Sequence, residues 1–441
     1  MTSMTEFGGI KLDVSATEDF LPAAELDAMA PAVNAAAAEL ENGTCPGSEY
    51  LGWLDLPDSI TEEDFQAIEA SAARAHEDSQ LYVVVGIGGS YLGSRAVLDA
   101  LRGMETDSRT GYPEIVFAGT GLCSSTLNRV LSKCTGRSFR ICVISKSGTT
   151  LEPAVAFRTL RSSLVDNFGP TEAARRITAV TDGSRGALRQ LADSEGFETF
   201  VIPDNVGGRF SIFTPVGLVP LAAGGVDVRA LVAGAQKMRV ACQSTDLRNN
   251  PAHLYAAVRH GLYGKGFTTE VMSTFHGDLQ TIQEWWKQLF GESEGKGGEG
   301  IFPASTVFTT DLHSMGQYIQ DGRRNLQETF LCVRNAVSRL TVPNDESEGG
   351  NLDGLNYLAG RTLDDINWKA YEGTKKAHGA GGVPCSSLEV DAITPEIIGG
   401  LLYMFEKAVG VSGRLLGVNP FDQPGVETYK KEMFRLLGKS Q

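Results

Sequence analysis

The sequence lacks the segments that would carry the chain into or across a membrane. No apolar run approaches the roughly 20 residues that a bilayer-spanning helix needs. The segment from Met1 to Asp19 has Lys11 as its one basic residue and no apolar core of a signal peptide. We therefore expect a cytoplasmic protein with no membrane partner.

Positive charge is also scarce. Lys and Arg number 39 against 54 Asp and Glu, which gives a formal net charge of −15. An acidic surface of this kind is poorly suited to nucleic acid or to an anionic membrane. It leaves room for a small anionic substrate, because a local loop can outweigh the field of the whole molecule.

Cysteines are few, and they are not arranged as metal ligands or as disulfide pairs. No CxxC occurs and no histidine stands at a spacing suited to zinc, so we expect reduced, buried thiols, no metal and no cofactor. The seven cysteines are Cys45, Cys123, Cys134, Cys142, Cys242, Cys332 and Cys385.

Short apolar runs separated by helical segments are present from Gln80 onward. Runs without alternation between helices indicate a parallel sheet that is covered on both faces. The first set predicts a doubly wound α/β unit from about Glu62 to Asn205, and a second α/β unit follows it. The expected strands are LYVVV, EIVFAG, SFRICVIS, RRITAV and ETFVIP in the first unit, and TTEVMSTF and ETFLCVRN in the second.

This pattern predicts an α/β protein with two doubly wound, mostly parallel sheets and flanking helices at both ends. We expect N-terminal helices in 1–61 that pack on the larger domain, a smaller domain in 62–210, a larger domain in 211–418 and a C-terminal helix within 419–441. The acidic, Gly-rich segment from Asn344 to Gly354 is expected to be a solvated loop.

Two polar loops follow strands of the first unit. Gly86-Ile87-Gly88-Gly89-Ser90 is neither a dinucleotide fingerprint nor a P-loop, since Tyr91 stands where the third glycine belongs and no Lys follows Gly93. Alone, such a turn explains tight helix packing as well as it explains anion binding.

The second loop is Ser145-Lys146-Ser147-Gly148-Thr149-Thr150, at the expected start of a helix. Capping that helix needs only one hydroxyl, so four hydroxyls and a Lys favour a phosphate cradle. Loops at the carboxyl ends of strands in one sheet converge on one crevice. Together, and without nucleotide signatures, they predict a phosphorylated sugar bound by Gly88, Gly89, Ser90, Ser145, Lys146, Ser147, Thr149 and Thr150.

Longer motifs carry a family resemblance. The segment 204–211 (DNVGGRFS) and the segment 421–430 (FDQPGVETYK) match the two signatures of glucose-6-phosphate isomerases. The segments 285–296 and 311–317 resemble those that carry the family's catalytic glutamate and histidine. From about Leu81 to Phe434 the chain is similar to the shorter bacterial type of this family, which is built on sugar isomerase (SIS) domains.

The resemblance implies reversible isomerisation of glucose 6-phosphate to fructose 6-phosphate through a cis-enediolate, in glycolysis and gluconeogenesis. It also implies a homodimer with a shared active site. It assigns the base to Glu292, ring opening to His313 and Lys430, and charge stabilisation to Arg209. Gln423 would bind the substrate, Gly208 would clear space for Arg209, and Glu152 would support the phosphate loop or the base.

The residues alone leave several choices open. Proton transfer between adjacent carbons suits one carboxylate, but only the resemblance selects Glu292 over Glu294 and Glu299, which we expect to be solvated loop acids. His378 is the doubtful member of the remaining histidines, which we expect to be structural. A non-catalytic SIS-type regulator would not need Glu292, Arg209, His313 and Lys430 together. Whether mannose 6-phosphate is also used is left open.

Overall fold

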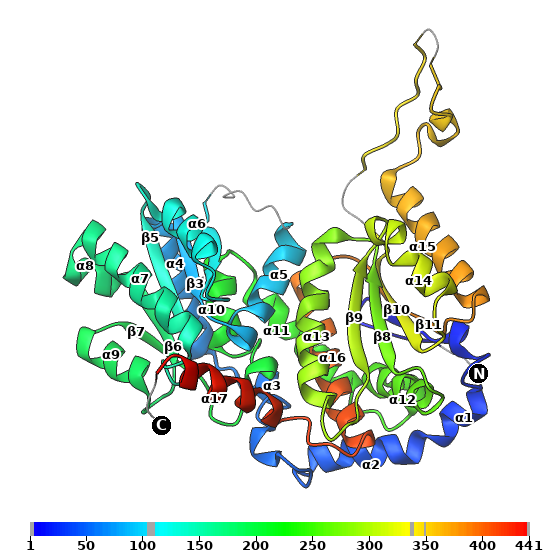
Figure 1. Cartoon of the computed structure of the whole chain (residues 1–441), viewed down its shortest axis with the longest axis horizontal. Coiled ribbons are helices and arrows are strands. Elements are labelled where there is room, and N and C mark those ends of the chain that lie inside the picture. The colour runs from blue at the N-terminus through cyan, green and yellow to red at the C-terminus, as the bar shows by residue number, and fades with distance from the viewer. Residues whose placement is uncertain (1–3, 104–110, 336–338, 348–349, 439–441) are drawn as a thin grey trace.

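A computed structural model describes residues 4–103, 111–335, 339–347 and 350–438 and shows two sheets side by side (Figure 1). The first sheet has five strands in the order β4-β3-β5-β6-β7, and all neighbouring strands are parallel. The chain starts at the inner strand β3, moves out to β4 and returns past β3 to β5, which makes the sheet doubly wound. The bounds are β3 Leu81–Val85, β4 Glu114–Ala118, β5 Phe139–Ile144, β6 Ile177–Thr181 and β7 Glu198–Val201.

Both faces of this sheet are covered because successive strand residues point to opposite sides. On β3, Leu81, Val83 and Val85 pack in one core with α6 to α9, whereas Tyr82 and Val84 belong to the core that contains α4, α5 and α10. These helices are α4 Glu62–Asp78, α5 Leu92–Arg102, α6 Ser124–Cys134, α7 Leu151–Phe168, α8 Pro170–Arg175, α9 Ala187–Glu195 and α10 Pro215–Ala223.

The second sheet has six strands in the order β1-β2-β11-β10-β8-β9. Its parallel part, β9-β8-β10-β11, repeats the winding of β4-β3-β5-β6, and β1 and β2 add an antiparallel hairpin at the edge. The bounds are β1 Met4–Phe7, β2 Ile10–Asp13, β8 Thr269–Thr274, β9 Phe302–Val307, β10 Leu326–Val333 and β11 Cys385–Val390.

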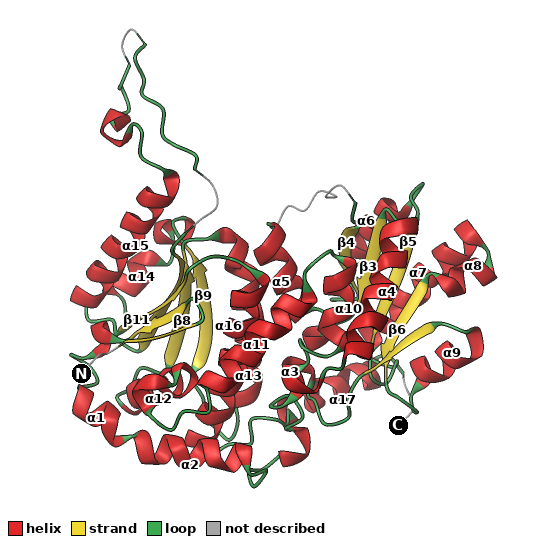
Figure 2. Ribbon diagram, turned by 180° about the vertical axis from the view of Figure 1, so that it is seen from behind, coloured by secondary structure: helices red, strands yellow, loops and turns green. Residues whose placement is uncertain are grey.

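The helices of the second half lie in two layers, one on each face of the second sheet, and some of them also connect this sheet with the first half (Figure 2). Residues of α14 and α15 share one core with the sheet, and those of α12, α13 and α16 belong to the large central core on its other face. The bounds are α1 Ala23–Ala28, α2 Ala30–Glu41, α3 Leu56–Ser59, α11 Val228–Ala241, α12 Pro251–Gly264, α13 Gln280–Glu294, α14 Gly316–Asp321, α15 Leu363–Ala380, α16 Pro395–Leu415 and α17 Glu427–Leu436.

The expected fold class, with two mostly parallel, doubly wound sheets and flanking helices, is confirmed. The prediction of helices alone in 1–61 is wrong for its first residues, where the β1–β2 hairpin lies. Its strands have four residues each, too few for an alternating pattern to stand out. The division of the chain at residues 61, 210 and 418 stays a prediction.

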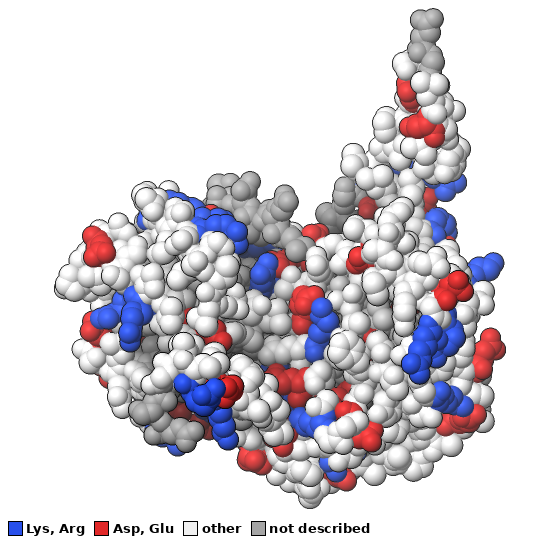
Figure 3. Space-filling model, viewed as in Figure 1, with Lys and Arg blue, Asp and Glu red and all other residues white. Residues whose placement is uncertain are grey.

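The exposed surface carries charges of both signs. On the face shown in Figure 3, acidic and basic side chains are interspersed, and the surface is hollowed between the two halves. The described residues of the segment from Asn344 to Gly354 form an exposed loop, as expected. None of the helices in the described part of the chain combines the length and the apolar character needed to span a membrane.

A very close helix contact lies where α11 crosses α16. A Cβ atom at Gly399 would lie 1.8 Å from the carbonyl oxygen of Leu231, and one at Gly234 would lie 1.8 Å from that of Glu396. The two backbones therefore touch, which only glycine permits.

We predict that Gly399→Ala lowers the free energy of unfolding by about 1–3 kcal/mol, because the added methyl forces the two helices apart. Gly373→Ala is the matched control. Gly373 lies inside α15, and a Cβ atom there would have no neighbouring atom within 4 Å, so alanine should raise stability by about 0.5–1 kcal/mol. Urea denaturation of both variants makes the measurement, and equal stability of the two would contradict the close-contact argument.

Candidate active site

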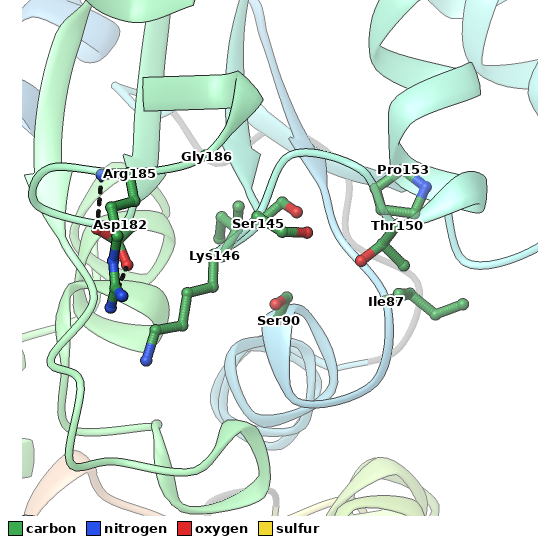
Figure 4. A pocket seen from close by; sticks show the side chains of 11 residues that line it. Ile87, Ser90, Ser145, Lys146, Thr150, Pro153, Asp182, Arg185 and Gly186 are labelled. Atoms are coloured by element: carbon green, nitrogen blue, oxygen red, sulfur yellow. Dashed lines mark hydrogen bonds and ion pairs between the residues drawn. The ribbon is translucent and has the colours of Figure 1, made fainter. Parts of the chain in front are cut away.

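The two polar loops lie at the carboxyl ends of the neighbouring strands β3 and β5. The chain winds in opposite directions from these strands, so a crevice forms between their connections. A pocket of about 440 Å³ occupies it, and in Figure 4 the side chains of Ser90, Ser145, Lys146 and Thr150 surround the open space. The lining residues are Ile87, Ser90, Ile144, Ser145, Lys146, Ser147, Thr150, Pro153, Asp182, Arg185 and Gly186.

The second loop is held in shape by its own hydroxyls. The Ser145 Oγ accepts the N–H of Gly148 at 3.0 Å, and the Ser147 Oγ accepts the N–H of Thr149 at 3.2 Å. Gly148 has φ +73°, and a Cβ there would lie 2.4 Å from the backbone nitrogen of Leu188. The helix α7 begins directly after this loop, so its N-terminus adds favourable potential for an anion.

Two cations stand beside the pocket and share a carboxylate. The Lys146 Nζ lies 2.9 Å from Asp204 Oδ1, and the Arg185 Nη2 lies 3.7 Å from Asp204 Oδ2. The side chains of Arg185 and Asp204 are 75% and 69% exposed, so these ion pairs are weak and can be exchanged for an incoming anion. Asp182 accepts the N–H groups of Ser184 and Arg185, which lowers the pKa of its carboxyl.

Arg185 also lines this pocket and is not among the residues predicted from the sequence. It lies in the TDGSRG segment directly after β6, the next strand along the sheet from β5. Its position at the carboxyl end of a third parallel strand was the available signal.

A contact between glycines joins this pocket to Arg209. A Cβ at Gly89 would lie 2.0 Å from the carbonyl oxygen of Gly208, so the first glycine turn rests against the short helix Gly208–Phe210 that carries Arg209. Arg209 is only 3% exposed.

The Arg209 guanidinium is held on two of its three nitrogens. The Nε donates to Ser293 Oγ at 2.7 Å, and the Nη2 donates to the carbonyl oxygen of Asp422 at 3.0 Å and to that of Pro420. The Nη1 is held loosely, 3.4 Å from the Gln423 Oε1. Burial lowers the pKa of Arg209, and the carboxylates of Glu292 and Asp422 oppose that shift; the group stays charged.

Glu292 faces the loosely held Nη1 of Arg209. Its Oε2 lies 3.8 Å from the Arg209 Nη1, and its side chain is 22% exposed. The glycines around Glu292 in the sequence predict a turn after a helix, which is wrong because α13 extends to Glu294. The helical turn makes Ser293 available to Arg209 and fixes the direction of Glu292.

Gln288 is a second residue that the sequence analysis missed. It stands one helical turn before Glu292, and its Nε2 donates to Glu292 Oε2 at 3.2 Å. The same nitrogen is 3.1 Å from the Cβ position at Gly88, and the Gln288 Oε1 is buried without a partner among the residues that the structure describes. Its signal was the i, i+4 spacing that puts both residues on one helix face.

The two acids that follow Glu292, Glu294 and Glu299, differ in their exposure to solvent. Glu299 is exposed, as expected, and accepts the Tyr263 hydroxyl at 2.8 Å. The prediction of a solvated Glu294 is wrong, because its side chain is fully buried and paired with Arg259.

The C-terminal segment reaches the site through several contacts. Besides the Gln423 contact with Arg209, the Lys296 Nζ lies 3.0 Å from Asp422 Oδ1 and donates to the carbonyl oxygen of Asn419. Burial lowers the pKa of Lys296. Lys430 lies half-buried on α17, beyond a single 3-10 turn, Pro424–Val426.

His313 is not brought to Glu292 within one chain. The helix α13 packs along β9 and ends before the start of that strand, whereas His313 follows its far end, exposed, in the short helix Thr310–His313. A strand of six residues is about 20 Å long. Glu292 and His313 thus lie at opposite ends of β9.

Glu152 and His378 lie outside the pocket between β3 and β5. Glu152 lines a neighbouring cavity with residues 118–124, 126 and 127 and is absent from the lining of the pocket described above. His378 is buried, with its Nδ1 2.6 Å from Glu328 Oε2, so it belongs to the core of the second sheet.

All seven cysteines are free, as expected, although Cys123 is exposed rather than buried. Hydrogen bonds from Ser125 and Thr126 lower the pKa of the Cys123 thiol to about 7. In the described ranges, no three or more His, Cys, Asp or Glu side chains gather as metal ligands would.

The chain is similar to known proteins over almost its whole length. The family model for phosphoglucose isomerase matches residues 66–439. A glucose-6-phosphate isomerase of Alkaliphilus metalliredigens is 49% identical over 436 residues, which cover 98% of this chain and 96% of that protein. One from Listeria monocytogenes is 50% identical over 435 residues, with the same coverage.

Two solved structures share the fold over almost the whole chain. A hypothetical protein from Thermus thermophilus superposes with a TM-score of 0.86 at 27% identity, covering 97% of this chain and 99% of that one. A glucose-6-phosphate isomerase from Chlamydia trachomatis gives a TM-score of 0.80 at 20% identity, covering 99% and 90%. Because a family model and near-full-length relatives of about half-identical sequence agree, the chain belongs to the phosphoglucose isomerase family.

Proposed function

We propose that the site between the two sheets isomerises glucose 6-phosphate to fructose 6-phosphate by proton transfer, with Glu292 as the base. The observation that carries this proposal is the 3.8 Å approach of the Glu292 carboxylate to a buried guanidinium, beside a pocket built for an anion. A base and a fixed positive charge are the two groups that an enediolate mechanism requires.

The phosphate would bind in the pocket between β3 and β5. Ser90, the hydroxyls of Ser145 to Thr150 and the N-terminus of α7 supply donors, and Lys146 supplies charge. Arg185 joins this set in our proposal, because its weak ion pair with Asp204 leaves it free to turn toward the phosphate. The sugar would then extend past Gly89 and Gly208 toward Glu292.

The reaction would move two protons. After ring opening, Glu292 removes the proton from C2 of the aldose, and the C1 carbonyl oxygen gains the charge of the enediolate. The protonated Glu292 returns its proton to C1 while the hydroxyl proton at O2 passes to O1, which makes the ketose. The Nη1 of Arg209, least engaged by protein acceptors, would stabilise the charge on the enediolate oxygens.

Ring opening needs an acid at the ring oxygen and a base at the C1 hydroxyl, and we assign these roles to His313 and Lys430. Gln423, which accepts from Arg209, would orient the substrate. Since Glu292 and His313 lie at opposite ends of β9, a second copy of the chain would supply His313 to each site. The proposed assembly is therefore a homodimer with shared sites.

We predict that Glu292→Gln abolishes isomerisation and leaves sugar-phosphate binding largely intact. The base acts in the transition state, whereas affinity resides in the phosphate pocket. Turnover assays and calorimetric binding of glucose 6-phosphate measure the two effects, and the exposed Glu299→Gln is the matched control that should keep wild-type turnover. Substantial turnover in Glu292→Gln, or a wild-type reaction with no exchange of solvent hydrogen into C1 of the ketose or C2 of the aldose, would contradict the assignment.

We also predict that dialysis against a chelator leaves turnover unchanged, because Arg209 supplies the positive charge that a metal ion supplies in metal-dependent isomerases. The activity is measured before and after exhaustive dialysis against EDTA. Activity that disappears and returns with a divalent cation would disprove this prediction.

The shared site predicts complementation between two inactive variants. When Glu292→Gln and His313→Ala subunits re-associate at random, half of the dimers are mixed, and each mixed dimer has one site with both lesions and one with none. About a quarter of wild-type activity should then return. Differently tagged chains verify the exchange of subunits, and exchanged mixtures that stay inactive would rule out sharing.

A further inference from the structure

Three charged side chains lie fully buried directly behind the proposed base. Arg259 on α12, Glu270 on β8 and Glu294 at the end of α13 are 1%, 0% and 0% exposed. None of them lines the phosphate pocket, and the proposed mechanism does not use them.

Arg259 holds the end of α13 in two ways. Its Nη1 and Nη2 donate to the two carboxylate oxygens of Glu294 at 2.6 and 3.1 Å, a bidentate pair with a fixed geometry. The guanidinium also lies over the ring of Phe290, 4.3 Å from its centre, one turn earlier on the same helix.

The other side of Arg259 is anchored to the sheet. Its Nε donates to Glu270 Oε2, and the Glu270 Oε1 accepts the hydroxyls of Tyr255 at 2.6 Å and Thr329 at 2.7 Å. This series of hydrogen bonds therefore ties the last residue of α13 rigidly to two strands of the second sheet, β8 and β10.

Stability does not account for this arrangement. One cation faces two carboxylates, so the cluster carries excess negative charge in a fully buried place, where desolvation of ions is costly. Apolar residues of the same size would fill the space at lower cost. An ionic cluster of this kind is better explained by the geometry that it imposes.

The geometry bears on Glu292 through its neighbours in the chain. Glu292, Ser293 and Glu294 are consecutive, and the last turn of a helix lacks part of its backbone hydrogen bonds. Arg209 holds Ser293 at 2.7 Å from the side of the active site, and Arg259 holds Glu294 from the core. Glu292, the proposed base, directly precedes the two residues that make these contacts.

We infer that the Arg259–Glu294 pair is a positioning device that fixes the last turn of α13 so that Glu292 faces the Nη1 of Arg209. The inference rests on the proposed role of Glu292. Arg259 and Glu294 are positioning residues, and neither touches the substrate.

Two isosteric variants separate positioning from stability. Glu294→Gln and Glu270→Gln each remove one negative charge and leave Arg259 with one carboxylate. At 270 the new amide can still accept from the Arg259 Nε and donate to the hydroxyls of Tyr255 or Thr329. At 294 the amide nitrogen faces the N–H groups of the guanidinium, donor against donor, so the helical turn must shift.

We predict that Glu294→Gln lowers kcat about 10- to 100-fold and changes KM by less than about threefold, because a small misplacement of a base costs turnover rather than affinity. Glu270→Gln should keep kcat and KM within about threefold of wild type, and the melting temperatures of the two variants should be similar. Steady-state kinetics and thermal melts of the purified full chain make the test.

The inference would be overturned by wild-type kcat in Glu294→Gln, by a change in KM alone, or by an equal loss of kcat in both variants. Glu292→Gln is assayed beside them to keep two failures apart. If it retains turnover, the proposed base is wrong; if it is inactive while Glu294→Gln is normal, only the positioning role fails.

Discussion

A guanidinium that is almost out of contact with water has to be surrounded by acceptors. Around Arg209 these acceptors come from Glu292 and Ser293 at the end of α13 and from the 420–423 segment, both far from Arg209 in the sequence. Satisfying this one buried charge therefore brings together the second sheet's helix, the C-terminal segment and the glycine turns of the first sheet. The geometry of the proposed chemistry follows from the same set of contacts.

The two sheets have the same winding and contribute to the site in different ways. The first sheet uses the carboxyl ends of β3 and β5, where glycine turns and hydroxyls leave room for an anion. The second sheet contributes the far end of α13, which returns to the amino ends of β8 and β9. The loop that carries His313 leaves the carboxyl end of β9 and so faces away from Glu292, which is why the proposed mechanism requires a second copy of the chain.

Several elements could be predicted from local pattern, and others could not. The strands β3 and β5 are buried on both faces, so β3 is a continuous apolar run and β5 is interrupted only by Arg140. The strands β1, β2 and β9 are short or mix polar residues with proline, and they exist because neighbouring strands pair with them. Glu294 shows the same limit: nothing in GESEG distinguishes it from a solvated acid, because its partner Arg259 lies 35 residues away in sequence.

The sequence by itself determined the class of fold, the places of the two polar loops and the family, because these depend on local composition, on turn chemistry and on motifs read in order along the chain. Only the tertiary structure decided that Glu292 belongs to a helix and faces a buried Arg209, that Arg185 and Gln288 join the site, and that His313 lies at the other end of β9. These are relations between segments distant in sequence, and they are set by the packing of helices on sheets and by the need of buried charges for partners, neither of which is encoded at a single position.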